Sequence, residues 1–250
     1  MKRNRIIMII SLVVVLVVNF LANALPINGV TTGEVSDEFP ILFVPAGYVF
    51  SIWGLIYAAL IAFVIYAMTP KGLADEKIDS ITWWFVAANL FNATWIFLWH
   101  YMQFTLTVFA ILGLLVSLLA IYLKLRIGLL KRSLTETLLV AAPFGIYLGW
   151  ATVATVANIS QALYSAGWNG GPLSPAVWTV IMLAVASLLG VLMIFTRKEV
   201  AYPLVLVWAF VGIWVKHSGT PLVATTALLL AIILAVLTFG RLLFKALRKA

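Results

Sequence analysis

The 250-residue sequence contains no cysteine and only two histidines, His100 and His217. The missing cysteines exclude disulfides, thiol chemistry and cysteine-ligated metals, and the scarcity of histidine argues against a histidine-based metal site. Charged residues make up only 10% of the chain, whereas soluble domains carry roughly a quarter of their residues as Asp, Glu, Lys and Arg. We therefore expect no metal site and no soluble globular domain.

Long apolar runs dominate what is present, because 64% of the residues are hydrophobic. A helix needs about 20 mostly apolar residues to cross the hydrocarbon core of a bilayer. Lipid cannot satisfy backbone hydrogen bonds, so runs of this length should be helices. The sequence predicts an all-α, polytopic transmembrane bundle of about eight spans, near Ile6–Leu25, Ala46–Met68, Ile81–Tyr101, Phe104–Leu123, Leu138–Tyr164, Pro175–Phe195, Val200–Val215 and Leu222–Phe239.

The basic residues are distributed unevenly between the two sides that these spans define. The net charge of +8 would suit a nucleic-acid partner, but the basic residues lie in short clusters that flank apolar runs. Every lysine and arginine except Lys216 falls on the side of the N-terminus, the 69–80, 124–136 and 196–199 loops and the C-terminal tail. The positive-inside rule then predicts that both termini are cytoplasmic. We expect an integral protein of a bacterial plasma membrane, with no nucleic-acid partner.

The first span has an alternative interpretation as a cleaved signal peptide. A basic segment, an apolar run and the tripeptide Ala22-Asn23-Ala24 follow one another there. The run is long for a signal peptide, so we expect it to remain as a span. The next stretch, residues 25–45, is rich in Gly, Thr, Ser and acidic residues and is long enough to fold over the mouth of the bundle.

No Asp, Glu, Lys or Arg falls inside a predicted span. Ionisable residues within the membrane are the usual signature of proton relays and ion-coupled transport. Hydrolysis within the membrane would need paired carboxylates, or a nucleophile with a base. The sequence therefore offers no catalytic residues, and the aromatic and amide side chains in its spans suit binding better than turnover.

Three spans carry aromatic and amide side chains at helical spacing, which places each set on one face of its helix. The sets are Phe50, Trp53 and Tyr57 in the second span, Asn89, Asn92, Trp95 and Trp99 in the third, and Tyr147, Trp150, Ala154, Asn158 and Gln161 in the fifth. Buried Trp N–H and Tyr O–H groups need partners, so such residues point at each other, at amides or at a ligand. Periodicity alone leaves open whether these residues pack helices together or line a site.

The remaining candidates have structural interpretations. Tryptophans near span ends commonly anchor helices at the membrane interface, and we interpret in this way Trp83, Trp84, Trp99, Trp168, Trp178 and Trp214. Ala186 and Gly190 have the small-xxx-small spacing that is typical of a helix-packing face.

Together, the three sets resemble motifs of the tryptophan-rich sensory protein family, also called the translocator or TspO/MBR family. The family's last helix has the form Y-L-x-W-A-T-x-A-T-x-x-N, which Tyr147–Asn158 matches. Asn92–Trp95 looks like the family's N-x-x-W, and Pro45–Tyr57 looks like its P-x-x-W-V-F…W-x-x-x-Y. The sequence departs from the family pattern at Ala88, where the family usually has Gln, and at Tyr48, where it typically has Trp.

The resemblance covers residues 1–166 and implies a five-helix bundle that binds hydrophobic ligands, notably porphyrins and sterols, under the loop joining its first two helices. Carried over by motif, the ligand contacts would be Trp53, Tyr57, Asn92, Trp95, Tyr147, Trp150 and Asn158. Residues 25–45 would then be the lid, and residues 167–250 would add three helices that the five-helix members lack. Family members are often dimers, so a homodimer is a further expectation.

The leading functional hypothesis is a membrane binding or sensory protein for a hydrophobic or tetrapyrrole-like molecule. Such a protein needs no cofactor, although a tetrapyrrole or sterol-like ligand would be bound. One alternative is a small-molecule transporter whose three extra helices build a path. Another is a membrane enzyme that acts on a bound porphyrin or lipid. These alternatives predict flux and product formation respectively, whereas a binder shows neither.

Overall fold

The computed structural model describes residues 2–247, and these form helices and loops without a strand. Eight long helices match the eight predicted stretches: α1 Lys2–Ala24, α3 Ile52–Ala67, α6 Thr82–His100, α7 Phe104–Lys124, α9 Ala142–Ser165, α10 Pro175–Arg197, α11 Ala201–Lys216 and α12 Pro221–Leu247. The connections hold shorter elements: α2 Thr32–Asp37, α4 Pro70–Ala74, α5 Glu76–Ser80, α8 Leu134–Glu136, the 3₁₀ turns Ile27–Gly29 and Gly47–Ser51, and the π turn Thr137–Ala141. The prediction of an all-α bundle is confirmed.

Six of the eight segments, those containing α1, α3, α7, α9, α10 and α12, are long and apolar enough to cross a membrane. The apolar helix α11 has only 16 residues, so it measures about 24 Å against a hydrocarbon core of roughly 30 Å. Helix α6 is less apolar because it includes Asn89 and Asn92, but both side chains are buried and bonded to neighbouring helices. Their pairing lets a polar helix lie inside the bundle without exposing amides to lipid. The chain is an integral membrane protein.

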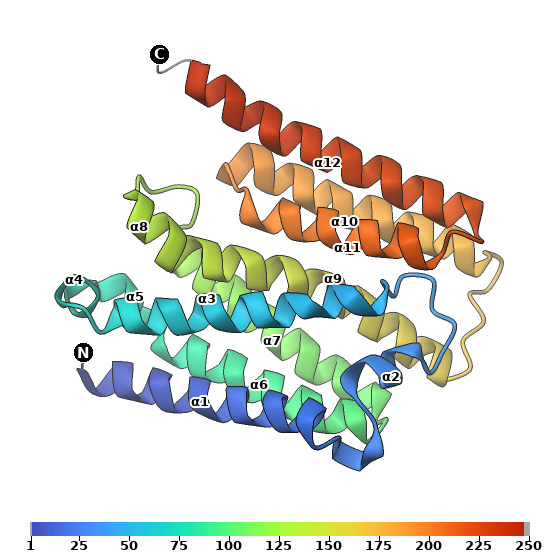
Figure 1. The fold of residues 1–250 in the computed structure, drawn as a ribbon, viewed down its shortest axis with the longest axis horizontal. Coiled ribbons are helices and arrows are strands. Elements are labelled where there is room, and N and C mark those ends of the chain that lie inside the picture. The colour runs from blue at the N-terminus through green and yellow to red at the C-terminus, as the bar shows by residue number, and fades with distance from the viewer. Residues whose placement is uncertain (1, 248–250) are drawn as a thin grey trace.

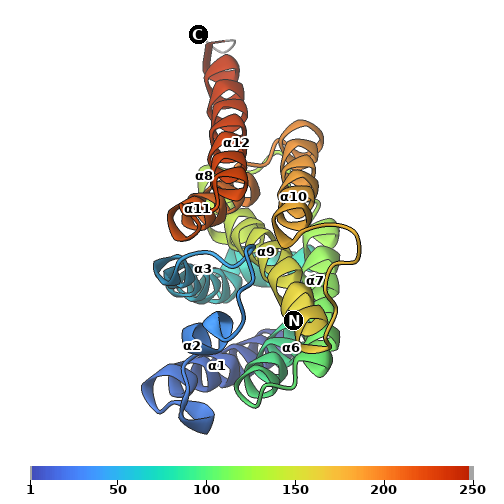
Figure 2. The ribbon, with the colours of Figure 1, turned by 90° about the vertical axis from the view of Figure 1, so that its right-hand side faces the viewer.

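The helices form two groups that meet at α9. The first group comprises α1, α3, α6, α7 and α9, and the second comprises α10, α11 and α12, which pack together beside it (Figure 1, Figure 2). A Cβ atom added at Gly145 of α9 would lie 3.0 Å from Glu199 Oε1, and one at Gly149 would lie 3.0 Å from the Tyr202 carbonyl oxygen. These two glycines therefore let α11 approach α9 closely, as small-xxx-small spacing does in membranes.

The second group is held together by another small residue. A Cβ atom at Gly190 of α10 would lie 2.9 Å from a methyl carbon of Leu206 on α11 and 3.0 Å from one of Leu234 on α12. Ala186, one turn earlier, is buried as well. Both residues serve helix packing, as their spacing predicted. The division of the chain into units at residue 166 stays a prediction.

The basic connections gather at one end of the bundle. Figure 1 shows the N-terminal end, α4, α5, α8 and the C-terminal end of α12 at that end, with α2 at the other. The α10–α11 connection lies there too, since Tyr122 at the end of α7 donates a hydrogen bond to Glu199 at 2.9 Å. Lys216 is at the opposite end, where it pairs with Asp37. This arrangement agrees with the predicted one-sided charge distribution, whereas assigning the basic end to the cytoplasm stays a prediction.

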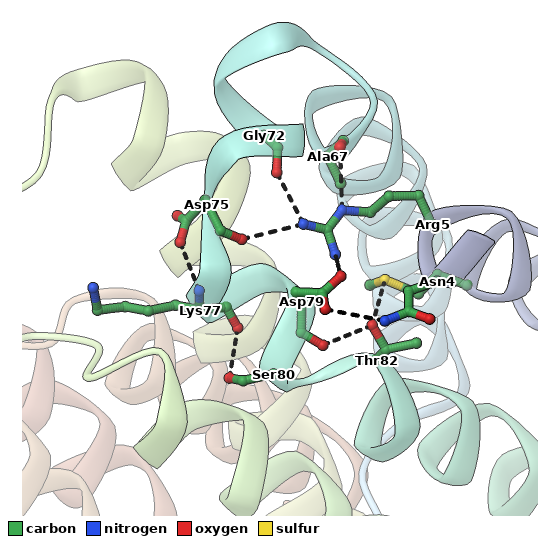
Figure 3. Close-up of polar contacts among 10 residues, drawn as sticks. Asn4, Arg5, Ala67, Gly72, Asp75, Lys77, Asp79, Ser80 and Thr82 are labelled. Atoms are coloured by element: carbon green, nitrogen blue, oxygen red, sulfur yellow. Dashed lines mark hydrogen bonds and ion pairs between the residues drawn. The ribbon is translucent and has the colours of Figure 1, made fainter. Parts of the chain in front are cut away.

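The first span begins earlier than predicted, and it carries a fully buried arginine. Arg5 lies inside α1 with none of its surface exposed. Its guanidinium donates to the carbonyl oxygens of Ala67 at 3.3 Å, Gly72 at 3.0 Å and Asp75 at 3.2 Å, and to the Asp79 carboxylate at 3.2 Å (Figure 3). The expectation that the spans hold no ionisable residue is therefore wrong at this end of α1. Arg5 acts as an internal brace that ties α1 to the α3–α6 connection.

Candidate functional site

A cavity of about 680 Å³ lies between α1 and α3, beneath the start of α2. Helix α1 supplies an apolar rim with two amides, α3 supplies aromatic rings, α2 covers the top, and α6 closes the back. The lining residues are Leu16, Asn19, Phe20, Asn23, Ala24, Thr32, Gly33, Phe50, Trp53, Tyr57 and Ile96. None of these residues carries a charge, so the cavity is an apolar chamber with a few amide and hydroxyl groups.

The α3 wall of the cavity is a stack of aromatic rings. Trp53 and Tyr57 are one turn apart and lie nearly parallel, with ring centroids 5.5 Å apart and 21° between their planes. Phe50, almost one turn earlier, completes the wall. The Tyr57 hydroxyl is buried and has no hydrogen-bond partner among residues 2–247. These rings supply most of the aromatic area on this side of the cavity.

The α1 wall carries two asparagines that the sequence analysis did not single out. Asn19 Nδ2 donates to Asn92 Oδ1 of α6 at 2.8 Å and to the Val15 carbonyl oxygen at 2.9 Å. Asn23, one turn further on, donates to the Asn19 carbonyl oxygen at 3.0 Å. The signal that could have found them is their spacing, because two asparagines four residues apart share one face of an otherwise apolar helix.

A second layer of side chains lies directly behind the aromatic wall. Asn92 Nδ2 donates to the Tyr147 hydroxyl at 2.7 Å, so α6 and α9 are joined just behind α3. Trp150 of α9 meets Trp53 edge to face, with centroids 6.1 Å apart, and meets Phe50 in the same way at 5.8 Å. The Trp150 indole nitrogen is buried and, within the described part of the chain, has no hydrogen-bond partner.

The last two predicted contact residues form a separate cluster. Trp95 Nε1 donates to Asn158 Oδ1 at 2.6 Å, and Asn158 Nδ2 donates to Thr107 Oγ1 of α7 at 2.7 Å. Trp95 also stacks on Trp99, with centroids 5.0 Å apart. These side chains pair with one another and do not line the cavity. Of the seven residues carried over from the family motifs, therefore, Trp53 and Tyr57 line the cavity, Asn92, Tyr147 and Trp150 lie behind it, and Trp95 and Asn158 lie elsewhere.

Helix α2 covers the cavity because its start is fixed to α6. Thr31 and Glu34 form a reciprocal capping box that begins the helix. The carbonyl oxygen of Thr32 accepts a hydrogen bond from Trp99 Nε1 at 3.2 Å, and its hydroxyl lies 3.4 Å from His100 Nε2. Trp99 is only 4% exposed, so its interpretation as a membrane anchor is wrong. It supports the lid instead.

The later part of the lid rests on α7 and α9. Gln161 Nε2 donates to the Val35 carbonyl oxygen at 3.0 Å. Phe39 packs against Phe104 and Tyr164, with ring centroids 5.4 and 5.2 Å away. Residues 25–45 therefore cover the end of the first helix group opposite the basic connections (Figure 1), as the sequence predicted from their length.

The groups around the cavity are aromatic, aliphatic, amide and hydroxyl side chains. No three histidine or carboxylate side chains come together anywhere in residues 2–247. The lining residues include no histidine, lysine, arginine or carboxylate, and the one base beside a lining hydroxyl is His100, whose Nε2 lies 3.4 Å from Thr32 Oγ1. What the cavity offers is aromatic area, an apolar rim and a few hydrogen-bonding groups.

Comparison with known proteins gives one match. A family model described as "TSPO-like protein" matches residues 5–240. The match continues through α10 and α11 and into α12, so the likeness is not confined to residues 1–166, where the motifs lie. Comparison with curated proteins and with solved structures gives no match.

Proposed function

The chain belongs to the TSPO-like family, and on that premise we propose that it binds a hydrophobic, tetrapyrrole-like small molecule in the cavity between α1 and α3. Membership of this family indicates small-molecule binding or transport in a membrane. The finer proposal depends on the cavity itself. The observation that carries it is a wall of parallel Trp53 and Tyr57 rings under a fixed lid.

Size and chemistry support a flat, mostly apolar ligand. The cavity volume of about 680 Å³ lies within the range of roughly 300–1,000 Å³ that is typical of small-molecule pockets. Stacked rings favour an aromatic partner laid against them. A macrocycle with polar edges would use the rings for its face and the amides of Asn19 and Asn23 for its edge.

Two unpaired polar atoms near the aromatic wall support the same proposal. The Tyr57 hydroxyl and the Trp150 indole N–H are both buried without partners among the described residues. Leaving such a group unpaired costs about 1–3 kcal/mol. Tyr57 lines the cavity, so a polar edge atom of a ligand or ordered water beside it would recover part of that free energy, whereas Trp150 lies behind the wall.

The shape of the core favours binding over passage across the membrane. Further along the same helices towards the basic end, Phe63, Phe85 and Phe144 are fully or almost fully buried. Their ring centroids lie 4.8–6.3 Å apart. These three rings fill the interior of the first helix group between the cavity and the basic end. A transporter would therefore have to rearrange its core each time a substrate molecule crossed.

Titration of the purified, detergent-solubilised protein with protoporphyrin IX, followed by tryptophan fluorescence quenching, tests the proposal. We expect saturable quenching at micromolar ligand. Trp53→Leu should weaken the affinity roughly tenfold, because it removes the stacking surface. Trp214→Phe is the matched control, since Trp214 lies on α11 and is 40% exposed.

Two results would count against the proposal. Absence of saturable quenching in the wild-type protein would reject a tetrapyrrole ligand. Equal affinity for wild type and Trp53→Leu would show that the ligand binds somewhere other than this cavity.

A further inference from the structure

The end of α11 is bonded to the segment that joins the lid to α3. The Ala46 backbone N–H donates to the Gly212 carbonyl oxygen at 3.1 Å, and Trp208 Nε1 donates to the Val49 carbonyl oxygen at 3.1 Å. His217, just past the helix, places its Nε2 3.0 Å from the Val44 carbonyl oxygen. Three hydrogen bonds over six residues therefore fix residues 44–49 to α11, and this set of contacts is called the clamp below.

The clamp also depends on close packing. A Cβ atom at Gly212 would lie 2.2 Å from Val49 Cγ2, far inside any real contact, so this position must lack a side chain. The ring of Tyr48 meets Trp208 edge to face, with centroids 5.3 Å apart. Gly212 and the Trp208 indole therefore pack closely against Tyr48 and Val49.

An ion pair between Asp37 and Lys216 extends the contact to the end of α2. Both side chains are partly exposed, and exposed pairs of this kind contribute about 0–1 kcal/mol. The ion pair is therefore the weakest part of the contact, and the hydrogen bonds and the Gly212 packing carry most of its free energy.

The clamp lies next to two parts of the cavity lining. Val49 directly precedes Phe50, which is the first residue of the aromatic wall. In the other direction, Asp37 is the last residue of α2, whose Thr32 and Gly33 cover the cavity. A shift of residues 44–49 would therefore move the lid and the aromatic wall together.

We propose that Trp208, Gly212 and His217 are positioning residues for the ligand site, so that the three-helix group sets how tightly the lid closes the cavity. The ligand in this inference rests on the proposed function. The contact between α11 and residues 44–49 does not depend on that proposal. It assigns a role to α10, α11 and α12, the helices outside the first helix group. The ligand affinity then depends on residues that touch no ligand.

Two variants of α11 test the clamp without changing the cavity lining. Trp208→Phe keeps a ring against Tyr48 and removes only the N–H donor to Val49. Gly212→Ala introduces the Cβ atom that the packing excludes. Trp214→Phe, on the same helix, is the matched control, and hydrogen exchange in α6 and α7 reports whether each variant is folded.

The first measurement is backbone hydrogen exchange of residues 32–49 in the ligand-free protein. Loss of one buried hydrogen bond should speed exchange there about threefold to tenfold in Trp208→Phe, and by more in Gly212→Ala. The second measurement is the protoporphyrin IX affinity, which should weaken about threefold to tenfold in Trp208→Phe. The control should match wild type in both measurements.

The outcomes separate this inference from the proposed function. Unchanged exchange at residues 32–49 in both variants would overturn the clamp, whatever the affinity. Faster exchange with unchanged affinity would overturn its coupling to the site. If the wild-type protein binds no porphyrin, the proposed function fails, while the exchange measurement still decides whether α11 holds the lid.

Discussion

The hydrogen bonds of Asn92 allow a prediction in which a second substitution restores part of the unfolding free energy that the first one removes. Asn92 is fully buried and joins three helices, through Asn19 of α1 at 2.8 Å and Tyr147 of α9 at 2.7 Å. Replacing Asn92 by Leu removes both bonds, at about 0.6 kcal/mol each for bonds between membrane helices. It also leaves the Tyr147 hydroxyl unpaired in the core, at about 1–3 kcal/mol. The total expected loss of unfolding free energy is about 2–4 kcal/mol.

The double variant Asn92→Leu, Tyr147→Phe no longer leaves a hydroxyl unpaired at position 147, so it should be more stable than Asn92→Leu alone. Replacing both partners of a buried hydrogen bond costs less than removing one of them. The assay is unfolding of the purified protein by SDS added to a mild detergent, with Ser165→Ala at an exposed position as the control. If the double variant were less stable than Asn92→Leu, the Asn92–Tyr147 bond would not be present in the folded protein and the reasoning would be refuted.

Three further predictions use the same preparation. Arg5→Leu removes four hydrogen bonds of the guanidinium, although the Gly72 and Asp75 carbonyl oxygens and the Asp79 carboxylate each keep another donor, so unfolding in SDS should show a loss of about 2–4 kcal/mol; a loss below about 1 kcal/mol would mean that Arg5 is not buried. Gly149→Val places methyl groups against Tyr202 and Val205, and the overpacking should cost about 1–3 kcal/mol, whereas Gly240→Val, at a helical position of α12 with open space around it, serves as a contrast for packing alone. Burial lowers the pKa of His217 below its ordinary value of 6.5, and the Lys216 charge acts in the same direction, while the Val44 carbonyl oxygen and Asp37 oppose it. Folding therefore favours the neutral imidazole. The stabilisation that His217 gives to the clamp is complete above pH 6.5, and it is lost as the pH falls through the lower pKa that His217 has in the folded protein. Hydrogen exchange of residues 44–49, corrected for its intrinsic pH dependence, should accelerate between pH 7.5 and 5 in wild type and stay flat in His217→Gln.

The helices were predictable from the sequence because hydrophobic length is a local property. All eight predicted stretches correspond to helices, including α6, whose asparagines weaken its apolar signal. Helix ends were less predictable, since α1 continues through the basic residues at its start. The burial of Arg5 could not be foreseen, because it depends on carbonyl oxygens more than 60 residues away along the chain.

The candidate site was only partly predictable for a related reason. Helical spacing placed Trp53 and Tyr57 on one face, and they do share a wall of the cavity. The same spacing placed Trp95 and Asn158 on polar faces without revealing that these two side chains satisfy each other. Asn19 and Asn23 were missed because an apolar run with two amides is still a plausible span. The spacing on one helix does not tell which neighbour its face will meet.

The close fit of α11 against α9 has a consequence for biosynthesis. Synthesis proceeds from the N-terminus, so α9 enters the membrane before α11 has been made. Until then the face formed by Gly145 and Gly149 has only lipid to meet, and residues 44–49 have no Gly212 or Trp208 to bond with. The first five long helices must therefore persist in the bilayer as an unfinished assembly. The contacts of residues 44–49 with α11 form only after α11 has been made.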